Sequence, residues 1–221
     1  MDILLVAGLW LDASAWNDVV PALEAAGHRA VPVTLPNAGD ATLDDQVAAA
    51  VAAVDAAPEP VMVVGHSAAC TLAWLAADRR PDRVAKVALI GGFPARDGQP
   101  YADFFEVRDG FMPFPGWGPF DGADSADLDE ETKGRMAAAA IPVPAGVAEG
   151  VVRLADERRF DVPVVVVCPE FTPAQAQEWI GAGDVPELAA AKHVDFVDID
   201  SGHWPMFTKP VELARLLALA G

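Results

Sequence analysis

Short runs of apolar residues along this chain alternate with segments in which apolar residues recur at the spacing of a helix face. The first run, Ile3 to Ala7, is continuous, which is typical of a strand buried on both faces. Ser14 or Asn17 is expected to cap a helix after it, and Gly27 is expected to end that helix. The chain is therefore predicted to begin with a strand followed by a helix.

The same alternation continues as far as residue 92. Thr42 and Asp45 open a helix with one apolar stripe, and Pro81 ends a later helix before the next apolar run. The elements predicted here are a strand over Arg29–Thr34, the helix that starts at Thr42, a strand over Val61–Val64, a helix over Ala68–Ala77 and a strand over Val84–Ile90.

Residues 93–161 interrupt this rhythm. The segment is rich in Pro, Gly, acidic and aromatic residues, and helical periodicity is present only over Leu128–Ala140 and Val147–Glu157. It is predicted to be a small cap, inserted after the fourth strand of a single domain that spans residues 1–221. Its aromatic residues suit either an apolar pocket or the packing of the cap onto the body. They are Tyr101, Phe104, Phe105, Phe111, Phe114, Trp117 and Phe120.

Strands and helices alternate again after the insertion. The predicted elements are a strand over Val162–Cys168, a helix around Gln175–Ile180, a turn of helix after Pro186, a strand over Val194–Ile199 and a closing helix over Val211–Ala220. Alternation at this spacing predicts an α/β fold, with a mostly parallel sheet of about six strands flanked by helices on both faces.

The charge balance excludes two classes of partner. The chain has 33 Asp and Glu against 15 Lys and Arg, which gives a formal net charge of −18 and a pI near 4.3. Such a surface repels phosphate backbones and anionic lipids, so neither a nucleic acid nor a membrane is expected as a partner. Many of the acids fall within residues 121–131, a cluster typical of a solvated face or a mobile loop.

The remaining features of composition predict a cytoplasmic protein without cofactors. No apolar run reaches about 18 residues, and an acid stands near the N-terminus where a signal segment carries basic residues. Cys70 and Cys168 are too few for a disulfide framework and are expected to be buried core thiols, with a cysteine nucleophile as the alternative. Neither metal-ligand spacing of His or Cys nor a Gly-x-Gly-x-x-Gly pattern is present, so no metal and no nucleotide cofactor are expected.

Ser67 is the candidate nucleophile. It lies in Val61-Met-Val-Val-Gly-His-Ser-Ala-Ala69, where an apolar run ends in a turn of small residues and a helix-prone stretch follows. A strand, a sharp turn and a helix in this order expose a serine hydroxyl at the end of a parallel sheet, as a nucleophile requires. Gly65 and Ala69 are expected where the two backbones pass closest, so both must be small. The alternative is that Ser67 only caps the helix.

His203 is the candidate general base. It follows the last predicted strand, and the carboxyl ends of parallel strands lie at one edge of the sheet. It is expected to take the Ser67 proton and to return it to the leaving group. The other histidines are set aside, because His66 is expected to point away from Ser67 while His28 and His193 precede strands at the opposite edge.

The acid that orients the histidine has two candidates, and the alternative is a site without an acid. Glu170 follows the strand before His203, which agrees with a chain order of serine, acid and histidine. Asp97, shortly after the fourth strand, is the competitor. Asp198 and Asp200 share the strand of His203 and are expected to be solvated or to lie in turns.

Five segments together resemble the α/β-hydrolases, nearest to the branch of small esterases that includes plant methylesterases and hydroxynitrile lyases. They are Val6-Ala-Gly-Leu-Trp-Leu-Asp-Ala-Ser-Ala-Trp16, Leu23-Glu-Ala-Ala-Gly-His28, Gly65-His-Ser-Ala-Ala69, Pro173-Ala-Gln-Ala-Gln-Glu-Trp179 and Gly202-His203. The resemblance covers nearly the whole chain. It implies the α/β-hydrolase fold, a cap over the active site, and an oxyanion hole formed by the backbone N–H groups of Leu9 and Ala68. Such donors stabilise the negative oxygen of a tetrahedral intermediate.

Three positions depart from the pattern of that family. Ala7 stands where the family often has His. The loop after Cys168 is short, and Phe171 lies near the place of a common Asp, which bears on the choice of acid. Trp204 follows His203 where the lyases carry Lys, which disfavours cyanohydrin cleavage.

The residues and the resemblance together predict a serine hydrolase without a cofactor. It is expected to cleave a small, largely apolar ester, thioester or lactone through an acyl-enzyme on Ser67. One alternative is a different reaction on the same three residues, catalysed by a perhydrolase, lyase or cyclase. A second is a catalytically silent relative that binds a small ligand.

Overall fold

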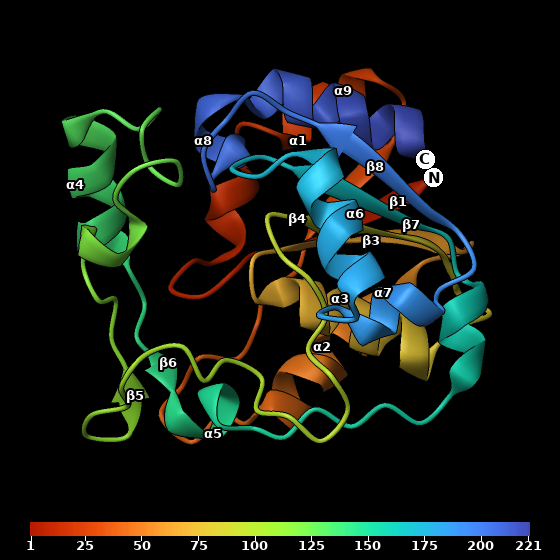
Figure 1. The fold of residues 1–221 in the computed structure, drawn as a ribbon, viewed down its shortest axis with the longest axis horizontal. Helices are drawn as coiled ribbons and strands as arrows, with labels where there is room; N and C mark the ends of the chain where they lie inside the picture. Colours follow the sequence, from red (N-terminus) through yellow and green to blue (C-terminus); the bar gives the residue numbers. More distant parts are fainter.

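The centre of the molecule is a six-stranded parallel sheet in the order β2-β1-β3-β4-β7-β8 (Figure 1). The computed structural model describes residues 1–221. The strands of the sheet are β1 (Asp2–Val6), β2 (Arg29–Pro32), β3 (Val61–His66), β4 (Val84–Ile90), β7 (Val164–Cys168) and β8 (Val194–Asp198). The prediction of a parallel sheet of about six strands is therefore confirmed.

Helices cover both faces of this sheet, because alternate residues of each central strand point to opposite sides. Leu4 and Val6 of β1 belong to one buried cluster, and Ile3 and Leu5 belong to the other. The first face carries α2 (Leu43–Ala56), α3 (Ala69–Arg79), α6 (Pro173–Ala182) and α7 (Pro186–Ala190). The second carries η1 (Ala13–Trp16), α1 (Val20–Ala25), α8 (Pro205–Thr208) and α9 (Pro210–Ala220). None of the helices combines the length and the apolar character that crossing a bilayer requires.

The predicted capping residues are found at the start of α2 but not at the start of α1. Thr42 and Asp45 form a reciprocal capping box at the start of α2, as predicted. The expectation that Ser14 or Asn17 caps the first helix is wrong. Asp12 caps η1 by accepting from the Ser14 N–H, and α1 begins after Val19 without a side-chain cap. Asp12, two residues before Ser14, satisfies the Ser14 N–H, so a short 3-10 helix forms before α1.

The insertion, residues 93–161, lies between β4 and β7 along the chain. The part that includes β5, α4 and β6 forms the left side of Figure 1, and the segment after α5 runs along the lower edge to the right-hand side. It contains β5 (Phe111–Met112), η2 (Gly118–Phe120), α4 (Glu130–Ala139), β6 (Val143–Pro144), α5 (Ala145–Ala148) and η3 (Glu157–Asp161). The expected helix over Leu128–Ala140 is present as α4, whereas the helix over Val147–Glu157 is wrong. Residues 150–152 run extended beside residues 98–101 and exchange backbone hydrogen bonds with them, which ends α5 after a single turn.

Candidate active site

Ser67 occupies a strained turn between β3 and α3. Its φ is 56°, a left-handed value that a residue with a side chain rarely adopts. A Cβ on Gly65 would lie 2.3 Å from the carbonyl oxygen of Ala69, and one on Gly92 would lie 2.7 Å from that of Ser67. The backbones are thus too close for side chains at Gly65 and Gly92, as the sequence predicts for Gly65.

Three predicted side chains meet at the carboxyl edge of the sheet. Ser67 Oγ lies 2.9 Å from His203 Nε2, and His203 Nδ1 lies 2.7 Å from Glu170 Oε1. The Glu170 and His203 side chains are only 15% and 13% exposed, so water screens their interaction weakly. Because the carboxylate only accepts, the Nδ1 of His203 carries a proton and Nε2 is left to accept from the serine hydroxyl.

Glycine at position 91 makes room for this pairing. Gly91 has a φ of 59°, and a Cβ there would lie 3.2 Å from His203 Nδ1 and 3.3 Å from Glu170 Oε2. Asp97 is placed elsewhere, where its carboxylate accepts from the Leu154 N–H. The structure therefore brings Glu170, and not Asp97, to His203. Asp198 and Asp200 are exposed.

Two free backbone donors stand next to Ser67. The N–H groups of Leu9 and Ala68 have no acceptor within the protein. Leu9 follows Gly8, whose position is so close that a Cβ on it would lie 3.0 Å from the Ser67 Cβ. These are the two donors predicted to face the oxygen of a tetrahedral intermediate.

His66 has a role that the sequence did not reveal. Its Nε2 donates to the backbone carbonyl of His203 at 2.8 Å, and the two imidazole rings are 5.0 Å apart. Burial, with a smaller contribution from the charge of His203, lowers the pKa of His66 to about 3. The ring is therefore neutral at ordinary pH and fixes the loop that carries His203. A histidine beside the nucleophile gave no signal of this contact, because its partner is a backbone group 137 residues away.

The acidic residues of the insertion contact the same loop. Asp127 accepts from the Gly202 N–H at 2.9 Å and from the Ser201 hydroxyl at 3.1 Å, and the Asp124 carbonyl accepts from the His203 N–H at 2.8 Å. We call Asp124 and Asp127 the acidic clamp. The expectation that residues 121–131 form only a solvated face or mobile loop is wrong for these two. A Cβ on Gly202 would lie 2.3 Å from the Asp124 carbonyl oxygen, so this glycine is needed for the contact.

The pKa of the Asp124 carboxyl is affected by Glu170 and His203. Burial raises its pKa, the negative charge of Glu170 raises it further, and His203 opposes this effect. Asp124 is thus a second acidic group in the electrostatic environment of His203.

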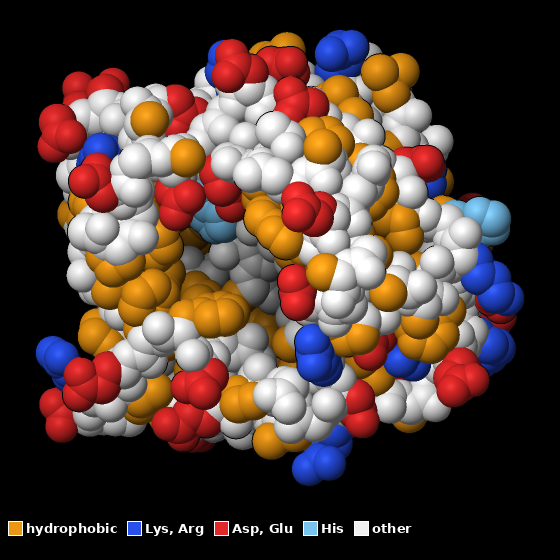
Figure 2. Space-filling view, viewed as in Figure 1, with side chains coloured by type: hydrophobic (Ala, Val, Ile, Leu, Met, Phe, Trp, Pro, Cys, Tyr) orange, Lys and Arg blue, Asp and Glu red, His pale blue; other side chains and the backbone are white.

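The aromatic residues of the insertion both pack it onto the body and line an apolar hollow, the two roles considered from the sequence. Phe105, Phe114 and Phe120 pack around Trp10 with ring centroids 5.4 to 6.0 Å apart, which joins the insertion to the body. Trp204, beside His203, contacts Trp117 and Phe120 in the same way. Figure 2 shows a hollow between the insertion and the body, with hydrophobic side chains on its walls and acidic ones around its rim.

A cavity of about 360 Å³ adjoins the serine. Its lining includes Ser67, Ala68, Phe93, Tyr101 and Phe104, together with polar side chains such as Gln99 and Asp103. It is large enough for a small ligand and has a mixed rather than a purely apolar lining.

Both cysteines are buried and unpaired, as predicted. Burial raises the pKa of the Cys70 thiol, and it raises that of Cys168 to about 12. Because a thiol reacts as its thiolate, neither cysteine is suited to act as a nucleophile.

Comparison with known sequences identifies related proteins. Residues 3–216 match the family described as the alpha/beta hydrolase family. The chain is 37% identical over 98 residues to Esterase PIR7B of Oryza sativa subsp. japonica, a match that covers 39% of this chain and 37% of the rice protein. It is 25% identical over 249 aligned positions to Methylesterase 7 of Arabidopsis thaliana, covering 97% of this chain and 94% of that protein.

Solved structures show the same fold over the full length. An extracellular alpha/beta-hydrolase from a Paenibacillus species superimposes with a TM-score of 0.81 at 17% identity, covering 100% of this chain and 99% of that one. The methylesterase MES16 from Arabidopsis gives a TM-score of 0.76 at 17% identity, with 100% and 98% coverage. At this level of identity the likeness establishes the fold alone.

Proposed function

Because this chain belongs to the alpha/beta hydrolase family, we propose that it is a serine hydrolase that cleaves a small, largely apolar ester, thioester or lactone through an acyl-enzyme on Ser67. The observation that carries the proposal is the continuous hydrogen-bonded series from Ser67 Oγ through the His203 imidazole to Glu170. The names of the related rice esterase and Arabidopsis methylesterase support ester chemistry.

In this proposal His203 moves one proton in each half-reaction. Nε2 takes the proton of Ser67 Oγ as that oxygen attacks the carbonyl carbon, and it returns the proton to the leaving alcohol, thiol or lactone oxygen. Glu170 stabilises the imidazolium that exists in between. Water then attacks the acyl group with His203 again as base, which releases the acid and restores Ser67.

The developing negative oxygen needs donors that are in place before the reaction. The N–H groups of Leu9 and Ala68 are the proposed pair, since both are free and both adjoin Ser67. A backbone donor of this kind contributes about 3 kcal/mol to the transition state in enzymes where it has been removed. Their proposed role depends on the backbone, so it tolerates apolar side chains at both positions.

The substrate class is proposed from the surroundings of the site. Phe93, Tyr101 and Phe104 line the cavity beside Ser67, which favours an uncharged ligand with apolar surface. The net charge of −18 supports a small molecule over a nucleic acid or an anionic membrane as partner. A cytoplasmic location stays a prediction.

A panel of chromogenic esters, thioesters and lactones of graded chain length tests this function. The wild-type protein should hydrolyse the shorter members, and Ser67→Ala should lower turnover by roughly four to six orders of magnitude. If no member is hydrolysed by folded protein, or if Ser67→Ala retains activity, the proposal is wrong. Binding without turnover would instead favour a silent ligand-binding relative.

A further inference from the structure

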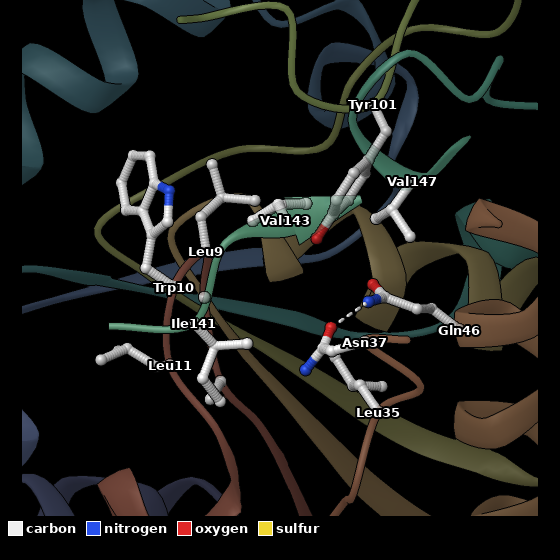
Figure 3. Close-up of a pocket in the computed structure, with 12 residues that line it drawn as sticks. Leu9, Trp10, Leu11, Leu35, Asn37, Gln46, Tyr101, Ile141, Val143 and Val147 are labelled. Carbon is white, nitrogen blue, oxygen red and sulfur yellow. Dashed lines mark hydrogen bonds between the residues drawn. The ribbon is translucent and has the colours of Figure 1, made fainter. Parts of the chain in front are cut away.

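A second, smaller cavity is lined by the loop that follows β1 (Figure 3). Its volume of about 10 Å³ corresponds to roughly one water-sized group. Gly8 and Leu9 line it, and Gly8 is in contact with Ser67, so the cavity adjoins the proposed oxyanion hole. Tyr101 lines both this cavity and the larger one at Ser67. Tyr101 thus stands between the two cavities, at the place where a group attached to a ligand at Ser67 would enter the smaller one.

One end of this cavity is polar although its walls are apolar. Gln46, which is 4% exposed, donates both N–H groups of its amide, to the Pro36 carbonyl and to Asn37 Oδ1, each at 3.0 Å. The Pro36 carbonyl only accepts, so the orientation of the Gln46 amide is determined and its Oε1 is the atom left without a partner. Asn37 is thereby oriented as well, and Figure 3 shows its nitrogen turned away from Gln46 and Tyr101.

Tyr101 brings a hydroxyl to the same space. The residue is 3% exposed, and its backbone N–H donates to the Gly150 carbonyl, which fixes its position. Figure 3 shows its ring pointing into the cavity toward the side where Asn37 and Gln46 lie, between the apolar side chains of Leu9 and Val147. The hydroxyl has no hydrogen-bond partner within the protein, and burial raises its pKa, so it remains a protonated donor at neutral pH.

The Tyr101 hydroxyl and Gln46 Oε1 belong to buried residues, line this water-sized space and have no partner within the protein, so a small polar group that enters it can bond both. We propose that Tyr101 and Gln46 form a subsite for a hydroxyl group carried by the substrate, with Asn37 holding the Gln46 amide in place. A hydroxyl can donate to Gln46 Oε1 while accepting from the Tyr101 hydroxyl. A carboxylate has no proton for Gln46, and no basic side chain lines the cavity. This subsite rests on the proposed hydrolase function, because it selects among substrates of Ser67.

Matched esters test this selectivity. The 4-nitrophenyl esters of butanoate, 2-hydroxybutanoate and 3-hydroxybutanoate place a hydroxyl on the acyl part, and 2-hydroxyethyl against ethyl butanoate places it on the alcohol part. Each kcat/KM is first divided by the rate of alkaline hydrolysis of the same ester, which corrects for intrinsic reactivity. For wild-type protein, the corrected value of at least one hydroxylated ester should then be roughly tenfold higher than that of its plain partner, the matching ester without the hydroxyl. Tyr101→Phe and Gln46→Met should each reduce that ratio toward one.

The outcomes separate this inference from the function on which it rests. Hydrolysis of plain and hydroxylated esters at equal corrected rates, or a ratio unchanged by both variants, overturns the subsite and leaves the hydrolase intact. Absence of all ester hydrolysis overturns the function first. The two variants are compared only if their circular dichroism and unfolding midpoints show folded protein.

A binding measurement on unaltered Tyr101 supplies an independent readout. Tyr101 is the only tyrosine, so protein labelled with 13C at the tyrosine Cζ gives one resonance from the subsite. In Ser67→Ala protein that resonance should shift on addition of the preferred hydroxylated ester and much less with its plain partner. Equal shifts with both ligands would mean that the hydroxyl does not reach Tyr101, and that the cavity holds only water.

Discussion

Glu170 is the residue on which the orientation of His203 depends in this account. Glu170→Gln replaces the accepting carboxylate by an amide that cannot balance an imidazolium, so kcat should fall by roughly three to four orders of magnitude. Asp97→Asn is the matched control, because Asp97 is bonded to the Leu154 N–H and not to His203. Steady-state kinetics of both variants, with folding checked by circular dichroism, decide the point. A large loss in Asp97→Asn alone would reverse the assignment.

His66 should make the protein sensitive to acid. Its pKa is about 3 in the folded state and about 6.5 in the unfolded chain, so between these pH values the unfolded state binds one more proton. The free energy of unfolding should therefore decrease as pH falls from 6.5 to 3, by about 1.4 kcal/mol per unit from this residue. Urea unfolding of wild-type and His66→Gln protein across this range measures the difference. Parallel pH curves for the two proteins would contradict the assignment of His66 as buried and neutral.

Single residues could be predicted from the sequence where they belong to a local pattern. Ser67 stands in a strand, turn and helix of small residues, and His203 and Glu170 each follow a strand whose carboxyl end lies at one edge. His66 and Asp127 could not be found in this way. Their contacts depend on which distant loops the fold brings together, and that information is absent from the spacing of residues.

The acidic clamp operates at the level of elements, because it connects the insertion to the loop between β8 and α8. Asp127→Ala removes the acceptor for the Gly202 N–H and the Ser201 hydroxyl. A looser loop misplaces the His203 imidazole, so kcat/KM should fall by about tenfold, within the range expected when a catalytic group shifts by less than 1 Å. Activity assays with the preferred ester, together with unfolding midpoints, measure the two effects separately.

Asp121→Ala is the control in the same acidic segment, since Asp121 accepts only from the adjacent Gly122 N–H. Its activity should equal that of wild type. Equal losses in both variants would mean that general charge, and not the clamp, affects the reaction.

The positions of strands were predictable from the sequence where both faces of the strand are buried. Most of β1, β3 and β7 reads as a continuous apolar run because both faces of these strands are covered, and β4 does so only from Val87 to Ile90, after Lys86. The insertion was less predictable, since tertiary pairing overrides local preference there. Residues 150–152 have helical periodicity in sequence, yet they pair with residues 98–101 in the fold.

At the scale of the whole molecule, a buried ionic network ties the end of the insertion to the body. Arg159 in η3 bonds Glu187 at 3.0 Å and Asp78 at 3.3 Å, and Trp74 of α3 donates to the same oxygen of Glu187. Arg159→Met leaves a buried carboxylate without its cation and should lower the free energy of unfolding by about 3 kcal/mol. Arg135→Met, which removes an exposed pair, should change it by less than about 0.5 kcal/mol.

Urea unfolding of the two arginine variants provides this comparison. The folded Arg159→Met protein should keep its activity, because the network contacts the second half of α3 and α7, whereas Ser67 precedes the first residue of α3. Equal stability of the two variants would show that the buried network contributes little to holding the insertion in place.

Covalent labelling of Ser67 tests the central claim most directly. A fluorophosphonate reacts with a serine only when a neighbouring base activates it, so the folded protein should gain the mass of one adduct, located on Ser67 by peptide mapping. Ser67→Ala should gain none, and His203→Ala should react far more slowly. Folded wild-type protein that stays unlabelled, or carries its adduct on another residue, would contradict the account.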